Sequence, residues 1–194
     1  VRFFTTNGEY TGTCTEFSHL GKKLCLARTA FPCEDNRFFG RENATYSLVL
    51  YDSAGAAVKK STGRGWGPGG FLDPNDDVFV PGAGYFLSDG EKGVITRFSD
   101  SLRFVEEIEP GWGHLEFFPV GIAADHEGSI HALESNRNAI VKFSPPSKTD
   151  SSGYSFSRTY RLPDSAACVQ RIYRHDTSII VVDAVGGKGF RFST

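Results

Sequence analysis

The 194-residue chain is long enough for one domain with a sizeable core, and its 39% hydrophobic content is typical of a globular protein rather than a disordered one. A formal net charge of −2 gives no electrostatic basis for binding nucleic acid or an anionic membrane, which both favour strongly basic surfaces. No stretch approaches the roughly 18 uninterrupted apolar residues of a membrane-spanning helix, so no membrane span is predicted.

The chain repeats itself. An aromatic residue closes a short β-branched or basic run five times, at intervals of 47, 47, 45 and 49 residues. These aromatic anchors are Phe4, Tyr51, Phe98, Phe143 and Phe192. A carboxylate stands nine residues before each of the last four anchors, at Glu42, Asp89, Glu134 and Asp183. Repeats of this length with strand-like content predict propeller blades, because one blade cannot bury both of its faces alone.

The strand-like runs give the repeats their expected boundaries. The first repeat, residues 15–62, is defined mainly by Glu42, Tyr51 and Gly55. The second, residues 63–109, shows strand-like runs at 77–80, 84–88, 93–98 and 103–108. The third, residues 110–161, shows them at 119–124, 129–133, 139–143 and 154–160. The last is expected to combine residues 162–194 with 1–14. No helical periodicity of useful length is present, so the chain is predicted to be all-β.

The best-defined repeat resembles a known family. The residues that carry the resemblance are Gly111-Trp112-Gly113, Phe117, Pro119–Ala123, Gly128, Ile130, Glu134 and Phe143. Their pattern resembles the NHL repeat of β-propellers. The segment from Trp66 to Phe71 starts the preceding repeat in the same way, and the resemblance covers nearly the whole chain. The arginine usual in the family is replaced by Ser47, Val94, Ala139 and Lys188. The resemblance therefore implies the fold but no functional subfamily.

The expected fold is thus a single β-propeller domain, residues 1–194, of about four four-stranded blades. Both Phe4 and Phe192 would lie on third strands, so a closed ring of four blades would receive one of its strands twice. We expect residues 8–11 to add the outer strand to the last blade. The alternative is that the chain forms about four blades of a larger propeller, since NHL-like rings more often have about six.

Cysteine usage and one sequon indicate the compartment. The chain begins at Val1, has no methionine and no signal-like apolar segment, so we expect a processed product or a piece of a longer protein. The four cysteines, which include no CxxC pair, are Cys14, Cys25, Cys33 and Cys168. Asn43 begins an N-glycosylation sequon. These features favour a secreted or extracellular glycoprotein; reduced, buried cysteines and a chance sequon are the alternative.

Four cysteines allow three disulfide connectivities. Cys25 and Cys168 fall in the first-strand regions of the first and last repeats, which become neighbours if four blades close. We therefore expect Cys25 to pair with Cys168 and Cys14 with Cys33. A link between Cys14 and Cys168 would contradict this pairing.

Two repeated sets of charged residues are interpreted structurally. Each repeated acid ends a second strand, where its side-chain oxygen can accept hydrogen bonds from backbone N–H groups of the turn. Arg97, Lys142 and Arg191 each precede an anchor, and on one shared face they could form a basic rim that binds phosphate or acidic sugars. Because alternation places them opposite a buried aromatic residue, we expect a solvated strand face instead.

The histidines provide the alternative, metal-binding hypothesis. A propeller gathers residues from different blades around its axis, and the resemblance extends to amidating lyases that hold zinc with three histidines. His126 and His175 occupy equal turn positions in their repeats and are the candidate zinc or calcium ligands. Turn positions also tend to face solvent, and no HExxH spacing is present. The leading interpretation therefore includes no metal and no cofactor.

The loops between blades carry the candidate binding residues. Two Gly-Trp-Gly segments lie where propellers usually dock ligands, and they supply Arg64, Trp66, Trp112 and His114. An exposed tryptophan in such a loop offers a large anchoring surface. The alternative is that each tryptophan packs between adjacent blades while the glycines allow a sharp reversal.

These observations predict a non-enzymatic extracellular interaction module that binds a protein or carbohydrate partner through its inter-blade loops. Neither a Gly-x-Ser-x-Gly elbow nor a cysteine beside a plausible base is present. The alternative is a metal-dependent propeller enzyme of the lyase or lactonase type, with axial histidines or acids. Unpaired strands at the chain ends are open edges that could also recruit another copy of the chain.

Overall fold

The structure is a computed structural model. It describes residues 2–4, 10–13, 17–19, 22–24, 31–32, 37–42, 45–52, 54, 56–61, 63–113, 116–147, 153–166, 169–183 and 185–193. These residues form antiparallel strands and contain no α-helix. Within these ranges no helix has the length and apolar character needed to cross a membrane. The all-β prediction is confirmed.

Four sheets follow one another in chain order. The first contains β5 (Phe31–Pro32), β6 (Phe38–Glu42), β7 (Ser47–Tyr51) and β8 (Ala57–Lys60). The second contains β9 (Pro74–Val80), β10 (Gly84–Asp89), β11 (Val94–Phe98) and β12 (Phe104–Ile108). The third contains β13 (Pro119–Ala124), β14 (Ile130–Glu134), β15 (Ala139–Ser144) and β16 (Ser155–Arg161). The fourth has three strands, β17 (Val169–His175), β18 (Ser178–Asp183) and β19 (Lys188–Ser193).

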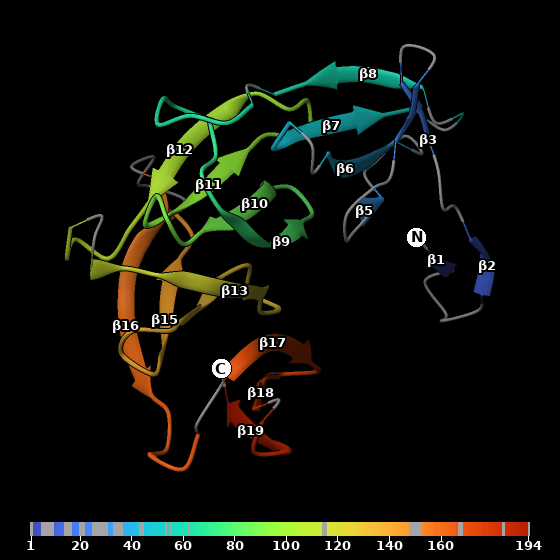
Figure 1. The fold of residues 1–194 in the computed structure, drawn as a ribbon. Coiled ribbons are helices and arrows are strands. Elements are labelled where there is room, and N and C mark those ends of the chain that lie inside the picture. Colours follow the sequence, from blue (N-terminus) through green and yellow to red (C-terminus); the bar gives the residue numbers. More distant parts are fainter. Residues whose placement is uncertain are drawn as a thin grey trace.

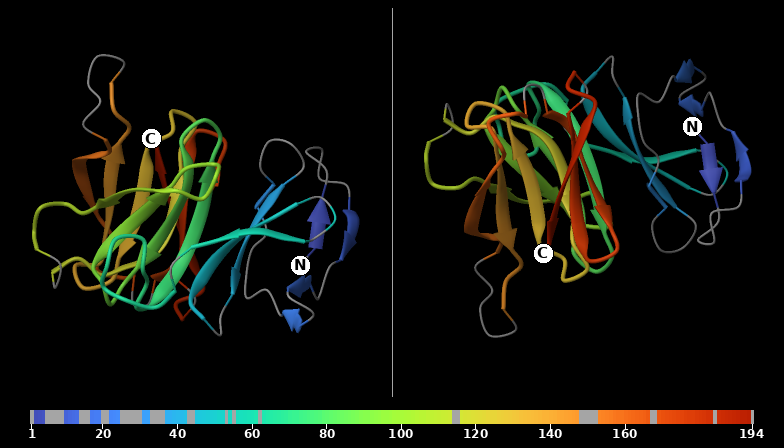
Figure 2. Two further views of the ribbon diagram at one scale, coloured as in Figure 1. Left: turned by 90° about the horizontal axis from the view of Figure 1, so that it is seen from above. Right: turned by 90° about the horizontal axis from the view of Figure 1, so that it is seen from below.

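The sheets are arranged radially. In Figure 1 they follow an arc, with the first strands β9, β13 and β17 towards its centre and the fourth strands β8, β12 and β16 at its outer rim. Figure 2 shows the sheets from β9 to β19 stacked face to face, with the first sheet leading to the N-terminal hairpins. This is the arrangement of a β-propeller with about four blades, as the repeat predicted.

The N-terminal strands form two separate hairpins. β1 (Arg2–Phe4) pairs with β2 (Tyr10–Thr13), and β3 (Phe17–His19) pairs with β4 (Lys22–Leu24). Among the described strands, β19 pairs only with β18. The assignment of residues 1–14 to the last blade, and with it the closure of the ring, stays a prediction.

Three hydrophobic clusters hold the blades together, one at each junction between neighbouring sheets. Strand β10 shows how a blade supplies two of them. Tyr85 and Leu87 face the first blade, whereas Phe86 faces the third. Because both faces are covered, every residue of β10 and of β14 is buried. A fully buried Phe or Leu side chain contributes about 1.5–3 kcal/mol, so the stacking of blades is the main stabilising interaction.

The aromatic anchors have a common direction. Phe98 packs into the cluster shared with the first blade, and Phe143 packs into the cluster shared with the second. Phe192 lies against the cluster shared with the third. Each of these anchors therefore faces the blade that precedes it in the chain, and this explains the regular interval at which they recur.

The residue before each anchor faces the following blade. Arg97 is 18% exposed, because Tyr154 of the next blade lies against it, and Lys142 is 13% exposed beside Asp125 of its own blade. Arg97 donates to Glu106 at 2.8 Å and lies over the rings of Phe86 and Tyr154. The expectation of a solvated face was wrong for these two residues. Arg191 is exposed, because no described sheet covers that face of the last blade.

The repeated acids fasten the hairpin between the second and third strands. Asp89 accepts backbone hydrogen bonds from Leu72 at 2.6 Å, Asp73 at 3.0 Å and Lys92 at 2.9 Å. Asp183 accepts from Val185 at 3.1 Å and Gly186 at 2.9 Å. Where the acid side chains are described, the predicted structural role is confirmed. Asp89 also ties the turn to the segment that enters its own first strand, which the sequence did not predict.

The same hairpin contains a left-handed residue four positions after each acid. The φ values there are 52° at Tyr46, 71° at Gly93, 49° at Asn138 and 61° at Gly187. Positive φ is unstrained for glycine and costly for other residues. The turn geometry is thus common to all four repeats although its residue type is not, and this hides the position from a sequence comparison.

Glu134→Gln is expected to lower the free energy of unfolding by about 1–3 kcal/mol. The buried Glu134 carboxylate accepts from the backbone N–H groups of Phe118 at 3.0 Å, Asn136 at 3.1 Å and Arg137 at 2.6 Å. A glutamine replaces one acceptor oxygen with an amide group that cannot accept. Urea unfolding measures the change. Glu116→Gln, at a side chain 63% exposed, is the control and should change stability by less than about 0.5 kcal/mol. Equal stability of the two variants would contradict the role of Glu134.

Gly187→Ala is expected to cost about 1 kcal/mol, because alanine is strained at φ 61° although no atom lies within 4 Å of the added Cβ. Gly189→Ala, two residues later in β19, is the matched control: its Cβ also meets nothing within 4 Å and its φ is not in the left-handed region. Comparing the thermal unfolding of the two variants separates the effect of the left-handed backbone conformation from that of the added methyl group. If Gly189→Ala proves equally destabilising, the cause is not the left-handed turn.

Candidate functional site

The loop between β8 and β9 is tied to its surroundings by hydrogen bonds. Its glycines form backbone hydrogen bonds from Gly65 N to Phe71 O and from Gly70 N to Gly67 O, each 2.9 Å long. The ammonium of Lys92, which is 3% exposed, donates to Gly67 O at 3.0 Å and to Gly70 O at 3.2 Å and also pairs with Glu107. Lys92 therefore anchors the loop to the hairpin of the second blade.

Two predicted binding residues lie on this loop. Trp66 is 64% exposed. Arg64 is also exposed, and its guanidinium lies 5.5 Å from the centroid of the Tyr46 ring. An exposed indole on a loop fixed by a buried lysine is an apolar surface that is already ordered.

Trp112, in the equivalent loop before β13, is in a different environment. It is half-buried and packs against the cluster between the second and third blades, with edge-to-face contacts to Phe117 and Phe156. The guanidinium of Arg137 lies 3.9 Å from its ring centroid. The alternative that each tryptophan packs between adjacent blades thus describes Trp112 and not Trp66. A binding role of Trp112 stays a prediction. His114 lies outside the described residues.

The two candidate metal ligands lie at exposed positions in or beside turns. His126 is exposed in the turn between β13 and β14, and His175 is exposed at the end of β17 beside Asp176 at 3.4 Å. Among the residues that the structure describes, no three His, Cys, Asp or Glu side chains are grouped as metal ligands. The zinc or calcium alternative stays a prediction. Asn43, Cys14, Cys25, Cys33 and Cys168 all lie outside the described ranges.

Polar side chains near the inner strands form hydrogen bonds from one blade to the next. Asp76 of β9 accepts a hydrogen bond at 3.1 Å from the backbone N–H of Ile122 in β13. Arg41 of β6 donates to Pro74 O of β9 at 2.7 Å. Burial raises the pKa of Asp76 above its ordinary value, and the neighbouring Asp77 adds to the rise against the lowering effect of the Ile122 hydrogen bond. These side chains satisfy backbone groups on the free edges of inner strands.

The third blade contains a buried polar network that sequence analysis did not find. Asp125 Oδ2 lies 2.9 Å from His131 Nε2 and 3.2 Å from Lys142 Nζ. Asp125 Oδ1 accepts from the backbone N–H groups of Glu127 at 3.0 Å and Ser129 at 2.9 Å. The His131 ring stacks on Tyr160 with centroids 6.3 Å apart. A single carboxylate thus fixes a turn, a buried imidazole and an ammonium group.

The charges of this network follow from its hydrogen bonds. Burial alone would raise the pKa of Asp125, but hydrogen bonds from His131, Ser129 and Lys142 together lower it to about 2. Burial lowers the pKa of His131 below its ordinary 6.5, although Asp125 acts in the opposite direction. At neutral pH the network is therefore an aspartate, a neutral histidine and a lysine, and His131 Nε2 carries the proton donated to Asp125.

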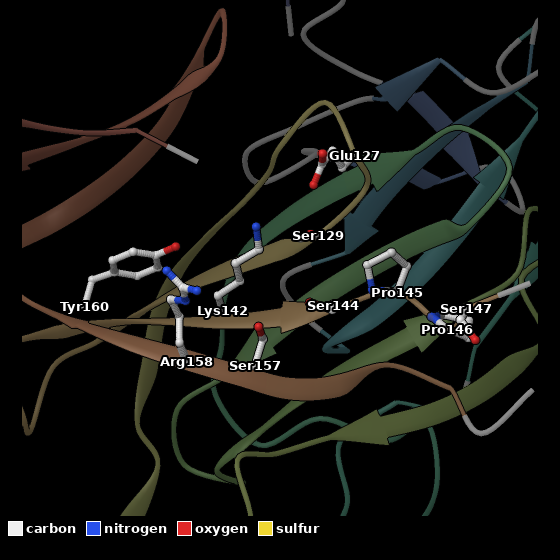
Figure 3. A pocket seen from close by; sticks show the side chains of 10 residues that line it. All are labelled: Glu127, Ser129, Lys142, Ser144, Pro145, Pro146, Ser147, Ser157, Arg158 and Tyr160. Atoms are coloured by element: carbon white, nitrogen blue, oxygen red, sulfur yellow. The ribbon is translucent and has the colours of Figure 1, made fainter. Parts of the chain in front are cut away.

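A pocket of about 540 Å³ opens beside this network (Figure 3). It is lined by strands β15 and β16, by the turn that follows β13 and by the loop that follows β15. The lining residues are Glu127, Ser129, Lys142, Ser144, Pro145, Pro146, Ser147, Ser157, Arg158 and Tyr160. Two cations, one carboxylate and five hydroxyl groups make its surface polar. Only Lys142 had been noticed in the sequence, as one of the basic residues before the anchors.

Comparisons with known proteins agree with this architecture. No protein-family model and no curated protein matches the sequence. In structure, the chain is similar to a streptogramin B lyase at 13% identity, with 99% of this chain and 61% of the lyase covered and a TM-score of 0.62. Virginiamycin B lyase from Staphylococcus aureus is similar at 14% identity, with 99% and 62% covered and a TM-score of 0.60. The WD40 repeats of RRP9 are similar at 12% identity, with 88% and 53% covered and a TM-score of 0.59.

At these identities the likeness shows the fold alone, and the fold is a β-propeller. The chain spans about three fifths of the length of the two lyases that it matches. The neighbours include enzymes and WD40 domains, so propeller architecture alone does not select a function.

His131 is expected to make stability depend on pH. Below about pH 6.5 the unfolded chain takes up a proton that the folded His131, with its lowered pKa, still excludes, so the free energy of unfolding falls as the pH decreases. Asp125, Lys142 and Tyr160 are the titratable groups that face His131. His131→Gln keeps an N–H donor but does not titrate, and it should reduce the stability lost between pH 7.5 and 5.5 in urea unfolding. His126→Gln, at an exposed position, should keep the wild-type slope; a reduced slope there and not at His131 would contradict the assignment.

Proposed function

We propose that the chain is an interaction domain that binds a protein partner through the loop of residues 63–73, with Trp66 as its central anchor. The supporting observation is the combination of a 64% exposed indole with a loop that hydrogen bonds of Lys92, Gly65 and Gly70 hold in place. Tryptophan is enriched among the residues that dominate binding energy at protein interfaces. A loop ordered before binding loses less conformational entropy when the partner docks.

The fold is compatible with this proposal, since the WD40 repeats that it resembles share the stacked-sheet architecture. The assignment to NHL repeats, made on the Gly-Trp-Gly segments and the spacing to Glu134 and Phe143, is part of the same proposal. A carbohydrate is the alternative occupant, because an indole face also packs on sugar rings.

A secreted location, N-glycosylation of Asn43 and disulfide pairing of the four cysteines complete the proposal. Peptide mapping of the protein from its natural source, without reduction, tests the expected Cys25–Cys168 and Cys14–Cys33 links. The same map shows whether Asn43 carries a glycan.

The second candidate is a metal-dependent enzyme of the lyase or lactonase type, which the similarity to two lyases favours. It requires axial acids or histidines as ligands, and Asp76, a half-buried acid on the inner strand β9, is a candidate. Elemental analysis of the purified protein separates the candidates: one tightly held zinc or calcium ion per chain would favour the enzyme.

Trp66→Ala is expected to weaken partner binding by at least about tenfold, because truncation of a central aromatic anchor commonly costs 2 kcal/mol or more. The partner is isolated with the wild-type domain from its natural source, identified, and titrated as a pure protein by calorimetry. Since Trp66 makes few internal contacts, thermal stability should be unchanged within about 0.5 kcal/mol.

Val185→Ala is the control, because it shortens another exposed apolar side chain at a distant turn in the last blade. It should bind the partner with wild-type affinity. Wild-type affinity of the Trp66→Ala variant would exclude this loop as the binding surface.

A further inference from the structure

We propose that the pocket beside β15 and β16 binds a phosphate or sulfate group of a small anionic ligand, between the side chains of Lys142 and Arg158. This pocket lies on the third blade and shares no residue with the Trp66 loop, so the inference is independent of the proposed protein-binding function.

The first argument is the register of the two cations. Lys142 of β15 lies directly opposite Arg158 of β16 in the antiparallel pair. Like charges in this arrangement repel each other and destabilise a sheet. Figure 3 shows both side chains on the same side of the strands, where they line the pocket. An anion held between them would remove this repulsion.

The second argument is that Lys142 is fixed before any ligand arrives. One N–H of its ammonium is directed at Asp125, 3.2 Å away, and its stem is largely covered. Asp125 accepts hydrogen bonds from four donors, of which Lys142 is the one cation, so the Asp125–Lys142 pair is neutral overall and the positive charge of this wall without a carboxylate partner in the described ranges is that of Arg158. An ammonium group has three N–H donors, and two remain to be directed into the pocket.

The third argument is that Arg158 has no carboxylate partner among the described residues. Its guanidinium is exposed and lies 5.7 Å from the centroid of the Tyr160 ring. A planar guanidinium can donate two parallel hydrogen bonds to a phosphate or sulfate group. The hydroxyl groups of Ser144 and Ser157 in the same wall can donate to further oxygens.

One group opposes an anion. Glu127 lines the pocket from the turn after β13, on a different element from Arg158. The ligand's charged group is therefore placed on the β15–β16 side, and the remaining volume of the pocket accommodates the group that carries it. Removal of the Glu127 charge should tighten binding.

The test is a titration of the ¹⁵N-labelled protein with methyl phosphate and, separately, methyl sulfate at low ionic strength and pH 7.5. Saturable shifts confined to the pocket-lining residues are expected. At this pH methyl phosphate is mostly a dianion, since the second pKa of a phosphate monoester is about 6, whereas methyl sulfate is a monoanion. Tighter binding of the phosphate would identify phosphorylated ligands as the natural class; tighter binding of the sulfate would identify sulfated ones.

Three variants of exposed side chains locate the site. Arg158→Gln should weaken binding about tenfold, as expected for loss of a charge-assisted hydrogen bond. Arg161→Gln removes the same charge three residues along β16 but outside the pocket, and it should bind as the wild type does. Glu127→Gln should bind several-fold more tightly. Shifts that do not saturate, or equal losses in the Arg158→Gln and Arg161→Gln variants, would overturn the proposal.

Discussion

The structure depends on the burial of both faces of each blade by its neighbours. A sheet such as β9–β12 presents Tyr85 and Leu87 on one face and Phe86 on the other, so it has no side that water could cover without cost. The same requirement explains why both faces of the middle strands β10 and β14 are buried. It also explains why Arg97 and Lys142, whose side chains are largely covered, are each paired with a carboxylate.

Much of this architecture could be predicted from the sequence, because it follows from periodic positions. The anchors Phe98 and Phe143 recur at a fixed interval since each packs on the preceding blade. The strand at 119–124 was predicted with its observed bounds, and the hairpin acids were assigned their hydrogen-bonding role. The left-handed hairpin position escaped notice because Tyr46 and Asn138 take the same conformation as Gly93 and Gly187. Backbone conformation repeats there, whereas residue identity does not.

The candidate sites were less predictable, because neighbours in space decide them. Trp66 and Trp112 stand in similar Gly-Trp-Gly segments, yet one is exposed and the other packs between Phe117 and Phe156. The Asp125 network joins residues from a turn and two strands, and the second and fourth blades have no equivalent of His131, since Phe86 and Ile180 occupy that position. A feature that occurs in a single repeat leaves no periodic signal in the sequence.

The burial of the strands differs between the blades. Every residue of β14 is buried, whereas Ile180 and Val182 on the outer face of β18 are only half-buried. Amide protons of a covered strand exchange with solvent only when neighbouring blades separate, while those of a strand with one open face need a smaller opening. The chain should therefore show amide protection that is highest in the second and third blades and declines towards β19, so that local fluctuations begin at the final sheet and spread inward from it.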